Sequence, residues 1–406
     1  MTQVIIAGAG PCGLLLALLL AKDRIEVTVL DGADKLDDQP RACYYAAPAT
    51  VEFERAGVLD QIKSEGIMPR SVCWRTSDGT RVTGMHNTTT PESSPLRLVS
   101  LTLGRVVEIL AERAAAAGVS IRMQHLVTGL GQDEGKAWVE VKIGPDGKEL
   151  LLEADYIIGC DGANSQVRRS LFGAEFPGST WEKQIIATNV YYPFEKFGYE
   201  DANFIVHPEN WYMAAKIAAD GLWRVTYGDV PNLTKAEYEQ RLPMRYKEIL
   251  PGSPEPTQYK VINVGPYKMH QRIAEKMRVG RVLLAGDAAH LCNPFGGLGL
   301  TGGIADIGGL YDCLRGIHLK VADESILDKY DEKRREKYST LIDPMSTSNF
   351  KRLWEKSPEE TIATDPFFEV ARKAEQDKEF SRTLLKDQLS IQHDFTQYYQ
   401  GAPIAA

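Results

Sequence analysis

The stretch VIIAGAGPCGLLLALLLAK at residues 4–22 joins a short apolar run, a glycine cluster and a long apolar segment. A second apolar run, residues 26–30, follows and ends at Asp31. A strand, a tight turn, a helix and a second strand form a βαβ unit, whose parallel strands are buried on both faces. The sequence therefore predicts an α/β fold built on a parallel sheet.

The glycine cluster has the spacing of a dinucleotide-binding fingerprint, G-x-G-x-x-G. The first glycine permits the tight turn, the second lets the backbone approach a pyrophosphate, and the third lets the helix pack closely on the strand. N–H groups at the helix start bind the anion, and an acid ~20 residues further on binds the ribose hydroxyls. We therefore predict a dinucleotide site at Gly8, Gly10, Pro11, Cys12, Gly13 and Asp31. A glycine-rich turn without a ligand is the plainer alternative, and the fingerprint by itself does not separate NAD from FAD.

The composition indicates a soluble globular enzyme. Of the 406 residues, 43% are hydrophobic and 25% are charged, which excludes a disordered or collagen-like chain and suits about two domains. The six cysteines are scattered without metal-ligand spacing, so we expect reduced thiols and no metal site. The net charge of −8 argues against nucleic acid as a partner. The apolar residues 14–21 are too few for a membrane span and follow no basic segment, so we expect a cytoplasmic protein.

Helix and strand patterns continue along the rest of the chain. Helices are predicted at residues 49–65, 105–117, 328–338 and 366–400. A hairpin is predicted around the Pro-Asp-Gly turn at 145–147. Period-two alternation predicts one antiparallel sheet from residues 185–192, 203–206, 211–217 and 223–227. This sheet interrupts the module that the fingerprint begins.

Two further motifs end predicted buried strands. The first is CDGANS at residues 160–165, followed by Val-Arg-Arg at 167–169. The second is GRVLLAGDAAH at residues 280–290, followed by NPFGGLGLTGG at 293–303 and by Asp306. In this order and after the N-terminal fingerprint, the motifs resemble the single-component FAD-dependent aromatic hydroxylases of the para-hydroxybenzoate hydroxylase type. The resemblance spans about residues 1–320.

The resemblance implies a definite domain organisation. We expect a Rossmann-like FAD-binding domain, an interleaved antiparallel-sheet substrate domain and C-terminal helices. The FAD-binding domain would be discontinuous, over residues 1–72, 98–178 and 270–322. The substrate domain would comprise residues 73–97 and 179–269, and residues 323–406 would form the C-terminal helical segment.

The resemblance also implies which residues hold FAD. Asp287, at a strand end, is placed to accept hydrogen bonds from ribityl hydroxyls, and the amino end of the following helix would stabilise negative charge on the reduced flavin. The chain departs from the family pattern at Leu103, Asn293 and Thr301, where a glutamine, a proline and an asparagine are usual. Besides the fingerprint residues, the expected FAD contacts are Arg41, Arg105, Val127, Asp161, Asp287, Gly297, Gly299, Leu300 and Thr301.

The activity that the resemblance implies is oxygen insertion into an aromatic ring. NADPH or NADH would reduce FAD, O2 would add to give a flavin C4a-hydroperoxide, and its terminal oxygen would pass to an electron-rich small molecule while the protein excludes water. A phenol reacts fastest as phenolate, so a basic or hydrogen-bonding group should meet its hydroxyl. The candidates are Tyr212, Arg224, His270 and the carbonyl of Pro294. Core packing of Tyr212, a surface position for Arg224 and a structural role for His270 are the plainer alternatives.

Two other functions remain open from the sequence. A flavin halogenase or reductase would keep the fold and change the reaction, but the halogenase Trp-x-Trp motif is absent. A non-catalytic binder of the GDP-dissociation-inhibitor kind would have no use for the intact Gly286-Asp287 pair. The expected partners are therefore an aromatic small molecule, NAD(P)H and O2, and the C-terminal helices could cap the enzyme or form a homodimer.

Overall fold

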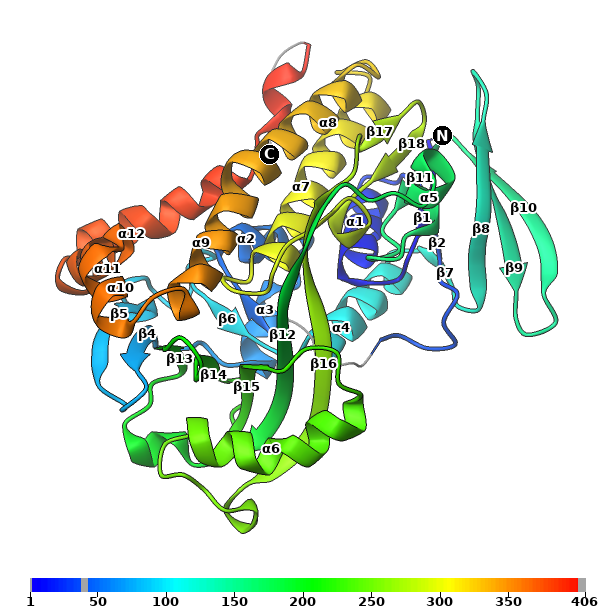
Figure 1. The fold of residues 1–406 in the computed structure, drawn as a ribbon. Coiled ribbons are helices and arrows are strands. Elements are labelled where there is room, and N and C mark those ends of the chain that lie inside the picture. The colour runs from blue at the N-terminus through cyan, green and yellow to red at the C-terminus, as the bar shows by residue number, and fades with distance from the viewer. Residues whose placement is uncertain (1, 38–42, 401–406) are drawn as a thin grey trace.

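The computed structural model describes residues 2–37 and 43–400. Its first module is built on a parallel sheet (Figure 1). Its six strands are ordered β17–β18–β11–β1–β2–β7, and only the β17–β18 pair is antiparallel. The central strands are apolar and buried, because layers cover both faces of the sheet. The strands are β1 (Gln3–Ala7), β2 (Glu26–Leu30), β7 (Ser120–Arg122), β11 (Tyr156–Gly159), β17 (Arg278–Val279) and β18 (Val282–Leu284).

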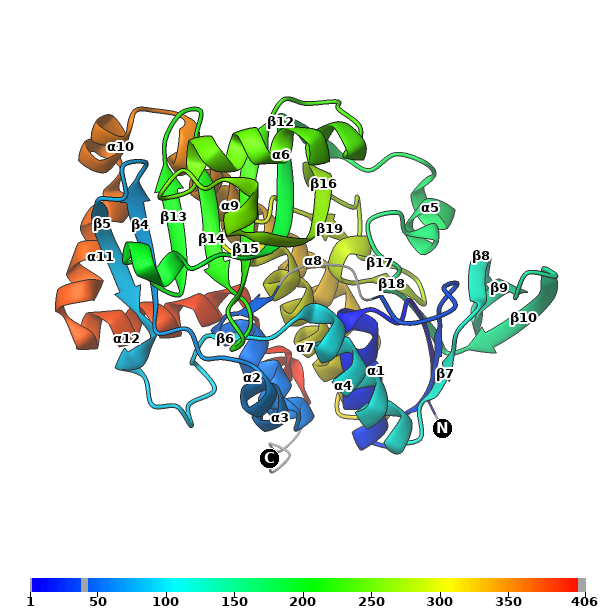
Figure 2. The ribbon, with the colours of Figure 1, turned by 90° about the horizontal axis from the view of Figure 1, so that it is seen from below.

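Helices cover one face of this sheet and a second, smaller sheet covers the other (Figure 2). Helices α1 (Pro11–Lys22), α4 (Leu103–Ala116) and α7 (Leu298–His318) form the helical layer, in which α1 contacts both of the others. The smaller sheet is antiparallel and consists of β8 (His125–Gln132), β9 (Ala137–Ile143) and β10 (Lys148–Ala154). Its β9–β10 pair confirms the predicted hairpin. Apolar residues of all three layers belong to one core.

The single helix predicted over residues 49–65 is wrong, because the chain forms two helices there. They are α2 (Ala47–Ala56) and α3 (Leu59–Glu65). Between them Gly57 takes a left-handed conformation with φ of 79° and donates its N–H to the carbonyl of Glu54. A glycine in this conformation ends a helix, so the chain forms two helices although the amphipathic pattern continues through Gly57.

The second module is an eight-stranded sheet in the order β19–β16–β12–β15–β14–β13–β4–β5. The strands predicted from period-two alternation pair antiparallel, as expected. The complete sheet is mixed, however, since β4 lies parallel to β13. The chain enters β4 and β13 on separate visits, so no hairpin forces them to be antiparallel. The strands are β4 (Ser71–Thr76), β5 (Arg81–His86), β12 (Gly178–Tyr191), β13 (Ala202–Val206), β14 (Tyr212–Lys216), β15 (Leu222–Asp229), β16 (Lys260–Ile273) and β19 (His290–Leu291).

Helix α6 (Lys235–Ile249) covers the outer face of the eight-stranded sheet, so the other face turns toward the first module (Figure 2). Successive residues of a strand point to opposite faces. On β15, Trp223, Val225 and Tyr227 therefore pack under α6. Arg224 and Thr226 point to the inner face. This face lies between the two modules.

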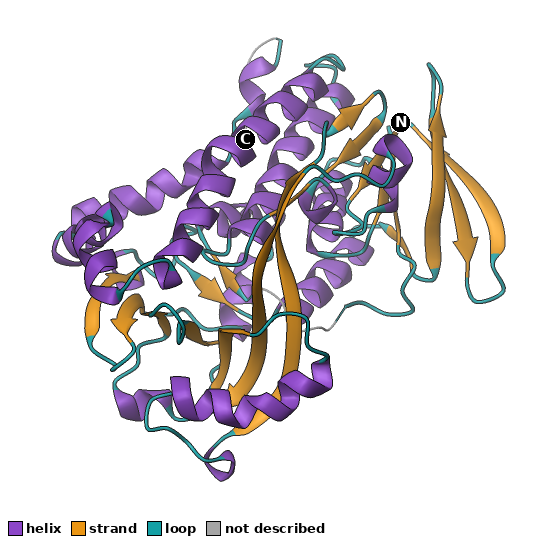
Figure 3. Ribbon diagram, in the orientation of Figure 1, coloured by secondary structure: helices purple, strands orange, loops and turns teal. Residues whose placement is uncertain are grey.

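Every element after β19 is helical (Figure 3). Helix α8 (Ile326–Lys337) continues through a π-helical turn, Tyr338–Ile342, into α9 (Asp343–Trp354). The helices α10 (Pro358–Thr364), α11 (Pro366–Gln376) and α12 (Lys378–Asp387) follow. Helix α9 contacts β13 and α11 contacts β5, so this segment packs on the end of the eight-stranded sheet. The remaining short elements are α5 (Gln166–Phe172), β3 (Tyr44–Tyr45) and β6 (Val99–Ser100). Within residues 2–37 and 43–400, no helix combines the length and apolarity that a bilayer crossing requires.

Candidate active site

The three sequence motifs meet at one edge of the parallel sheet. Each motif begins at the carboxyl end of a strand, and these strands, β1, β11 and β18, are neighbours. In open α/β sheets a ligand binds at this edge, because loops and helix starts converge there. The motifs are thus brought together from residues 8, 160 and 286 of the chain.

The fingerprint glycines serve two different purposes. A Cβ on Gly8 would overlap the carbonyl of Cys160, and one on Gly13 would overlap the carbonyl of Gly8, so both glycines permit close packing of the backbone. A Cβ on Gly10 would meet no atom within 4 Å among the described residues. Gly10 also precedes α1, which begins at Pro11 without a side-chain cap. The open space above Gly10 and the uncapped N–H groups are what an approaching phosphate needs.

The Gly286-Asp287 turn closes against this first loop. Gly286 has a φ of 62°, and a Cβ on it would lie 2.9 Å from the sulfur of Cys12. A Cβ on Gly303 of α7 would lie 3.0 Å from the same sulfur. Asp287 is exposed although its neighbours from Val282 to Ala289 are buried. Its carboxylate raises the pKa of Cys12, after the larger effect of burial, so it lies near the start of α1.

Asp31 lies at the end of β2 and holds the fingerprint loop from the side. Its Oδ2 accepts the N–H of Ala9 at 2.8 Å and its Oδ1 accepts the N–H of Ala33 at 2.8 Å. Val127 is buried on β8, whose first residue, His125, donates its N–H to the carbonyl of Asp31. These residues therefore lie at one corner of the same edge.

No described contact places the two basic residues predicted to bind FAD, Arg41 and Arg105, at this edge of the sheet. Arg41 lies outside the described residues. The guanidinium of Arg105 is bound by carboxylates of Glu65 at 2.6 Å, Glu108 at 2.8 Å and Glu112 at 3.4 Å. A role of either arginine in cofactor binding stays a prediction.

The second motif is bound to the third through a buried arginine. Asp161 caps α5 by accepting the N–H groups of Gln166 at 2.7 Å and Val167 at 3.1 Å through Oδ2. Its Oδ1 is buried and has no hydrogen-bond partner among the described residues. Arg168, which is also buried, donates to the carbonyls of Ala288 and Ala163 at 2.9 and 2.8 Å. Arg168 thus fixes the Asp287 turn relative to the Asp161 loop.

The glycine-rich start of α7 is held by hydrogen bonds within its own loop. Gly297 has a φ of 66°, and its N–H donates to the carbonyl of Pro294 at 3.1 Å. Thr301 donates its hydroxyl to the carbonyl of Gly297 at 2.7 Å and is itself buried, whereas Gly299 and Leu300 are partly exposed. The Pro294 carbonyl is therefore engaged within its own loop, and the Pro294 ring is exposed.

Gln271 on β16 anchors this loop and was not found by sequence analysis. Its Oε1 accepts the N–H of Asn293 at 2.6 Å and the Asn293 amide at 3.2 Å. Its Nε2 donates to Asp343 and Ser346 of α9. The only signal in the sequence is that Asn293 replaces a usual proline, since an asparagine can make these bonds and a proline cannot.

The inner face of the eight-stranded sheet carries a buried cation beside a floor of small residues. Arg224 is 7% exposed, and its Nε donates to the Oδ1 of Asn189 at 2.6 Å on the adjacent strand. Along the same face of β12 and β16 lie Ala187 and its partner Gly265. Ala187 is buried and Gly265 is partly exposed. A cation in a confined site favours an anionic group of a ligand.

Tyr267 stands at the other end of this floor. It pairs with Ile185, on the same face as Ala187 and Asn189. Its side chain is 40% exposed, yet burial raises the pKa of its hydroxyl to about 12, and the charge of Arg224 opposes that rise. The charge of Arg224 acts on the Tyr267 hydroxyl, so the two side chains lie near each other on the inner face. Sequence analysis missed Tyr267 because β16 was not among the predicted strands.

The structure does not bring Tyr212 and His270 to the inner face at Arg224 and Tyr267. Tyr212 pairs with Tyr227, lies under α6 and shares a hydrogen bond of 2.6 Å with the hydroxyl of Tyr199. It thus lies on the opposite face from Arg224. His270 contacts the hydroxyl of Thr180 at 2.9 Å near the end of β16, and burial together with Arg272 and Lys268 lowers its pKa.

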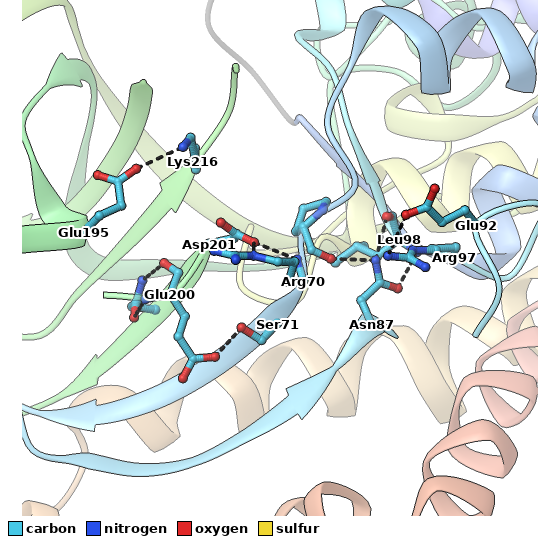
Figure 4. Close-up of polar contacts among 12 residues, drawn as sticks. Arg70, Ser71, Asn87, Glu92, Arg97, Leu98, Glu195, Glu200, Asp201 and Lys216 are labelled. Atoms are coloured by element: carbon cyan, nitrogen blue, oxygen red, sulfur yellow. Dashed lines mark hydrogen bonds and ion pairs between the residues drawn. The ribbon is translucent and has the colours of Figure 1, made fainter. Parts of the chain in front are cut away.

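Polar contacts hold the residues before β13 against the start of β4 (Figure 4). Arg70 donates its N–H to Asp201 at 2.7 Å, and Ser71 donates its hydroxyl to Glu200. The hydroxyl of Tyr44, on β3 of the first module, lies 3.0 Å from the carbonyl of Asp201 and 2.7 Å from that of Lys216. The inner face is therefore held at a set position relative to the first module.

These features fit a flavin dinucleotide. The space above Gly10 suits a pyrophosphate, the exposed Asp287 suits a ribityl hydroxyl, and the start of α7 suits a flat ring approached by backbone. The orphaned Oδ1 of Asp161 is a further acceptor near the same edge. The inner face at Arg224 and Tyr267 would then face the ring from the other module.

Comparisons with known proteins agree with this geometry. Residues 1–344 match the family described as FAD binding domain. A para-nitrophenol 4-monooxygenase of Pseudomonas sp. (strain WBC-3) is 36% identical over 370 residues, 91% of each chain. The 6-hydroxy-3-succinoylpyridine 3-monooxygenase of Pseudomonas putida (strain DSM 28022 / S16) is 37% identical over 361 residues, 88% of this chain and 90% of the relative. The crystal structure of a p-nitrophenol 4-monooxygenase from Pseudomonas putida DLL-E4 superposes with a TM-score of 0.89 at 35% identity, covering 96% of this chain and 99% of that one.

Proposed function

This chain belongs to the FAD binding domain family and is an FAD-dependent aromatic monooxygenase, and we propose that it oxygenates a phenol-like ring at the carbon opposite the ring hydroxyl. A halogenase, a reductase and a non-catalytic binder are not favoured, because the similar proteins are monooxygenases. We also propose NAD(P)H and O2 as co-substrates, and the mixed sheet as the substrate domain.

The position of oxygenation follows from the chemistry that the two relatives' names describe. In para-nitrophenol, position 4 carries the nitro group and lies opposite the hydroxyl. In 6-hydroxy-3-succinoylpyridine, position 3 carries the succinoyl group and also lies opposite the hydroxyl. A ring hydroxyl, once ionised, makes the opposite carbon electron-rich. We therefore propose a substrate with a hydroxyl and an electron-withdrawing substituent at opposite positions.

The buried cation Arg224 is the observation that carries this proposal. It would bind the phenolate oxygen or the oxygens of the opposite substituent, and Asn189 would hold the guanidinium at Nε. The ring would lie over Ala187 and Gly265, and Tyr267 would contact its far end. A phenol beside Arg224 would lose its proton more readily, and the phenolate formed has a more reactive ring.

The protein's own part in the reaction is binding, orientation and exclusion of water. FAD, when bound and reduced, supplies the activation of O2. Gly10, Asp287 and the start of α7 would hold it, and the Arg168 and Gln271 contacts keep those loops fixed. The aromatic cluster of Trp211, Phe295 and Phe350 packs behind the Pro294 loop and keeps that side dry.

Para-nitrophenol distinguishes oxygenation at the carbon opposite the hydroxyl from oxygenation at the carbon beside it. Oxygenation at the nitro-bearing carbon releases nitrite, whereas oxygenation beside the hydroxyl gives 4-nitrocatechol and no nitrite. We expect NADPH- or NADH-dependent O2 uptake with about one nitrite per ring. Nitrocatechol as the main product would refute the proposed position, and the absence of substrate-stimulated NAD(P)H oxidation by any para-substituted phenol would refute the substrate class.

Variants of Arg224 test the binding group. Arg224→Met should raise KM for the phenol by about 10- to 100-fold, since a charged hydrogen bond contributes about 1.5–3 kcal/mol. Arg224→Lys should recover part of the loss. Arg241→Lys is the matched control, because Arg241 lies on the α6 side and is paired with Asp229 at 2.7 Å. Equal KM values for the Arg224 variants and the parent would contradict the assignment.

A further inference from the structure

A fully buried trio of charged and polar side chains lies behind the Asp287 turn. Asp306 on α7, His290 on β19 and Arg334 on α8 are 0%, 1% and 0% exposed. Arg334 donates from Nε to the Oδ1 of Asp306 at 2.7 Å, and His290 contacts the Oδ2 through Nε2 at 2.7 Å. The trio lies apart from the Asp31, Asp161 and Arg224 contacts described above. Its members come from three elements that no local sequence pattern brings together.

The carboxylate of Asp306 also holds the backbone of the flavin loop. Its Oδ2 accepts the N–H of Gly286 at 3.0 Å. Gly286 is the left-handed residue that turns the chain so that Asp287 faces outward. The turn is therefore fixed by a side-chain acceptor on α7, one helical turn beyond Gly303, which packs on Gly286.

Arg334 carries the connection to the end of the chain. Besides Asp306, its guanidinium donates to the carbonyl of Gly302 at 3.3 Å and to the carbonyl of Ile391. Ile391 ends a short 3-10 turn, Gln388–Ile391, that lies after α12. One guanidinium thus links the C-terminal segment, the start of α7 and the Asp306 carboxylate.

Stability alone does not account for this arrangement. A buried ion pair loses about as much by desolvation as it gains by attraction, and apolar residues of the same volume often do as well. Apolar residues could fill the space but could not accept the Gly286 N–H. The Nδ1 of His290 is buried without a hydrogen-bond partner among the described residues. The two neighbours keep the carboxylate ionised, since His290 and Arg334 lower the pKa of Asp306 against the effect of burial.

We propose that Asp306 is a positioning residue for the flavin, which holds the Gly286-Asp287 turn in the shape that binds the ribityl chain, and that Arg334 keeps Asp306 in place. The proposal rests on FAD binding by the family and not on the substrate proposed above. FAD titration therefore decides it whichever ring is oxygenated.

The test compares FAD affinity with the exchange rate of the Gly286 amide. In Asp306→Asn and Arg334→Met, we expect the Kd for FAD of the reconstituted protein to rise by about 10- to 100-fold, the range for a charge-assisted hydrogen bond. Hydrogen exchange of peptides that contain Gly286 should be faster in both variants before FAD is added. Arg334→Lys should recover part of the affinity. Arg335→Gln is the matched control, because Arg335 lies on the same helix, is partly exposed and pairs with Asp331 at 2.9 Å.

A double variant separates positioning from neutralisation of charge. Asp306→Leu with Arg334→Met removes both buried charges together with the acceptor of the Gly286 N–H, and should fold even where a single variant does not. If Asp306 positions the turn, the double variant still binds FAD at least about tenfold more weakly than the parent. A return of the Kd to within about threefold of the parent would overturn the proposal, because Asp306 would then only balance Arg334. An unchanged Kd or unchanged Gly286 exchange in the single variants would overturn it as well.

Discussion

Glu52 is a buried carboxyl whose replacement by glutamine should stabilise the enzyme above pH 7. Its side chain lies on α2, and its Oε1 accepts the Gln392 amide at 2.7 Å. The nearby Arg55 lies 3.5 Å from Glu52 but pairs more closely with Asp312 of α7. The Arg55 guanidinium is thus shared between the carboxylates of Glu52 and Asp312. Burial, together with Asp312, raises the pKa of Glu52 from 4.5 to about 7, although Arg55 opposes this rise.

The size and sign of the effect follow from that pKa. The folded protein keeps a proton on Glu52 that the unfolded chain releases above pH 4.5. The contribution of this proton to the stability of the folded protein is full below pH 4.5 and is lost as the pH rises to about 7. A rise of the pKa from 4.5 to about 7 corresponds to about 3 kcal/mol of free energy of unfolding. Glutamine does not ionise, so the Glu52→Gln variant does not lose stability in this way. Its free energy of unfolding relative to the parent should increase by up to about 3 kcal/mol between pH 5 and pH 7.5.

The measurement is the urea midpoint of parent and variant from pH 5 to pH 8. Glu54→Gln is the matched control, because Glu54 is exposed on the same helix and two residues away. The difference between Glu52→Gln and the parent should grow with pH and level off above pH 7, while the control difference stays flat. A difference that is constant or shrinks across this range would show that Glu52 is ionised in the folded protein at pH 5.

Four further substitutions test the site and its surroundings. Asp287→Ala should give protein that folds but retains little FAD, measured as the flavin absorbance per chain, and full retention would contradict its role. Gly10→Ala should weaken FAD binding by about tenfold or more with an unchanged melting temperature of the apoprotein, whereas Gly8→Ala should lower that melting temperature, because its Cβ would overlap backbone. Tyr212→Phe should cost about 1 kcal/mol of stability through the lost bond to Tyr199 and leave the ratio of product to NAD(P)H consumed unchanged. A lower ratio would place Tyr212 in the reaction.

The motifs could be predicted from the sequence because each is a local backbone geometry. Gly8, Gly10 and Gly13 act within six residues, and the position of each glycine specifies where the chain turns or packs closely. Asp287 could be predicted for the same reason, since it follows a strand and a glycine. The hairpin at 145–147 and the C-terminal helices also depend on near neighbours, and both were confirmed.

The faces of the eight-stranded sheet could not be predicted in this way. Alternation along one strand shows that Trp223 and Arg224 point to opposite sides, but it does not say which side of one strand matches which side of the next. The register places Tyr212 opposite Tyr227 and Asn189 opposite Arg224. Only this pairing shows that Tyr212 lies under α6 and Arg224 faces the first module.

The sequence by itself determined that a dinucleotide edge exists, which loops form it and which family the chain resembles, because short-range glycine and strand patterns carry that information. The tertiary structure alone decided what supports the edge and what faces it. Gln271 meets Asn293, Arg334 meets Asp306, and Tyr267 lies on the same face as Arg224. Contacts of this kind join side chains that are far apart in the chain, and they depend on strand register and helix packing, which no local pattern specifies.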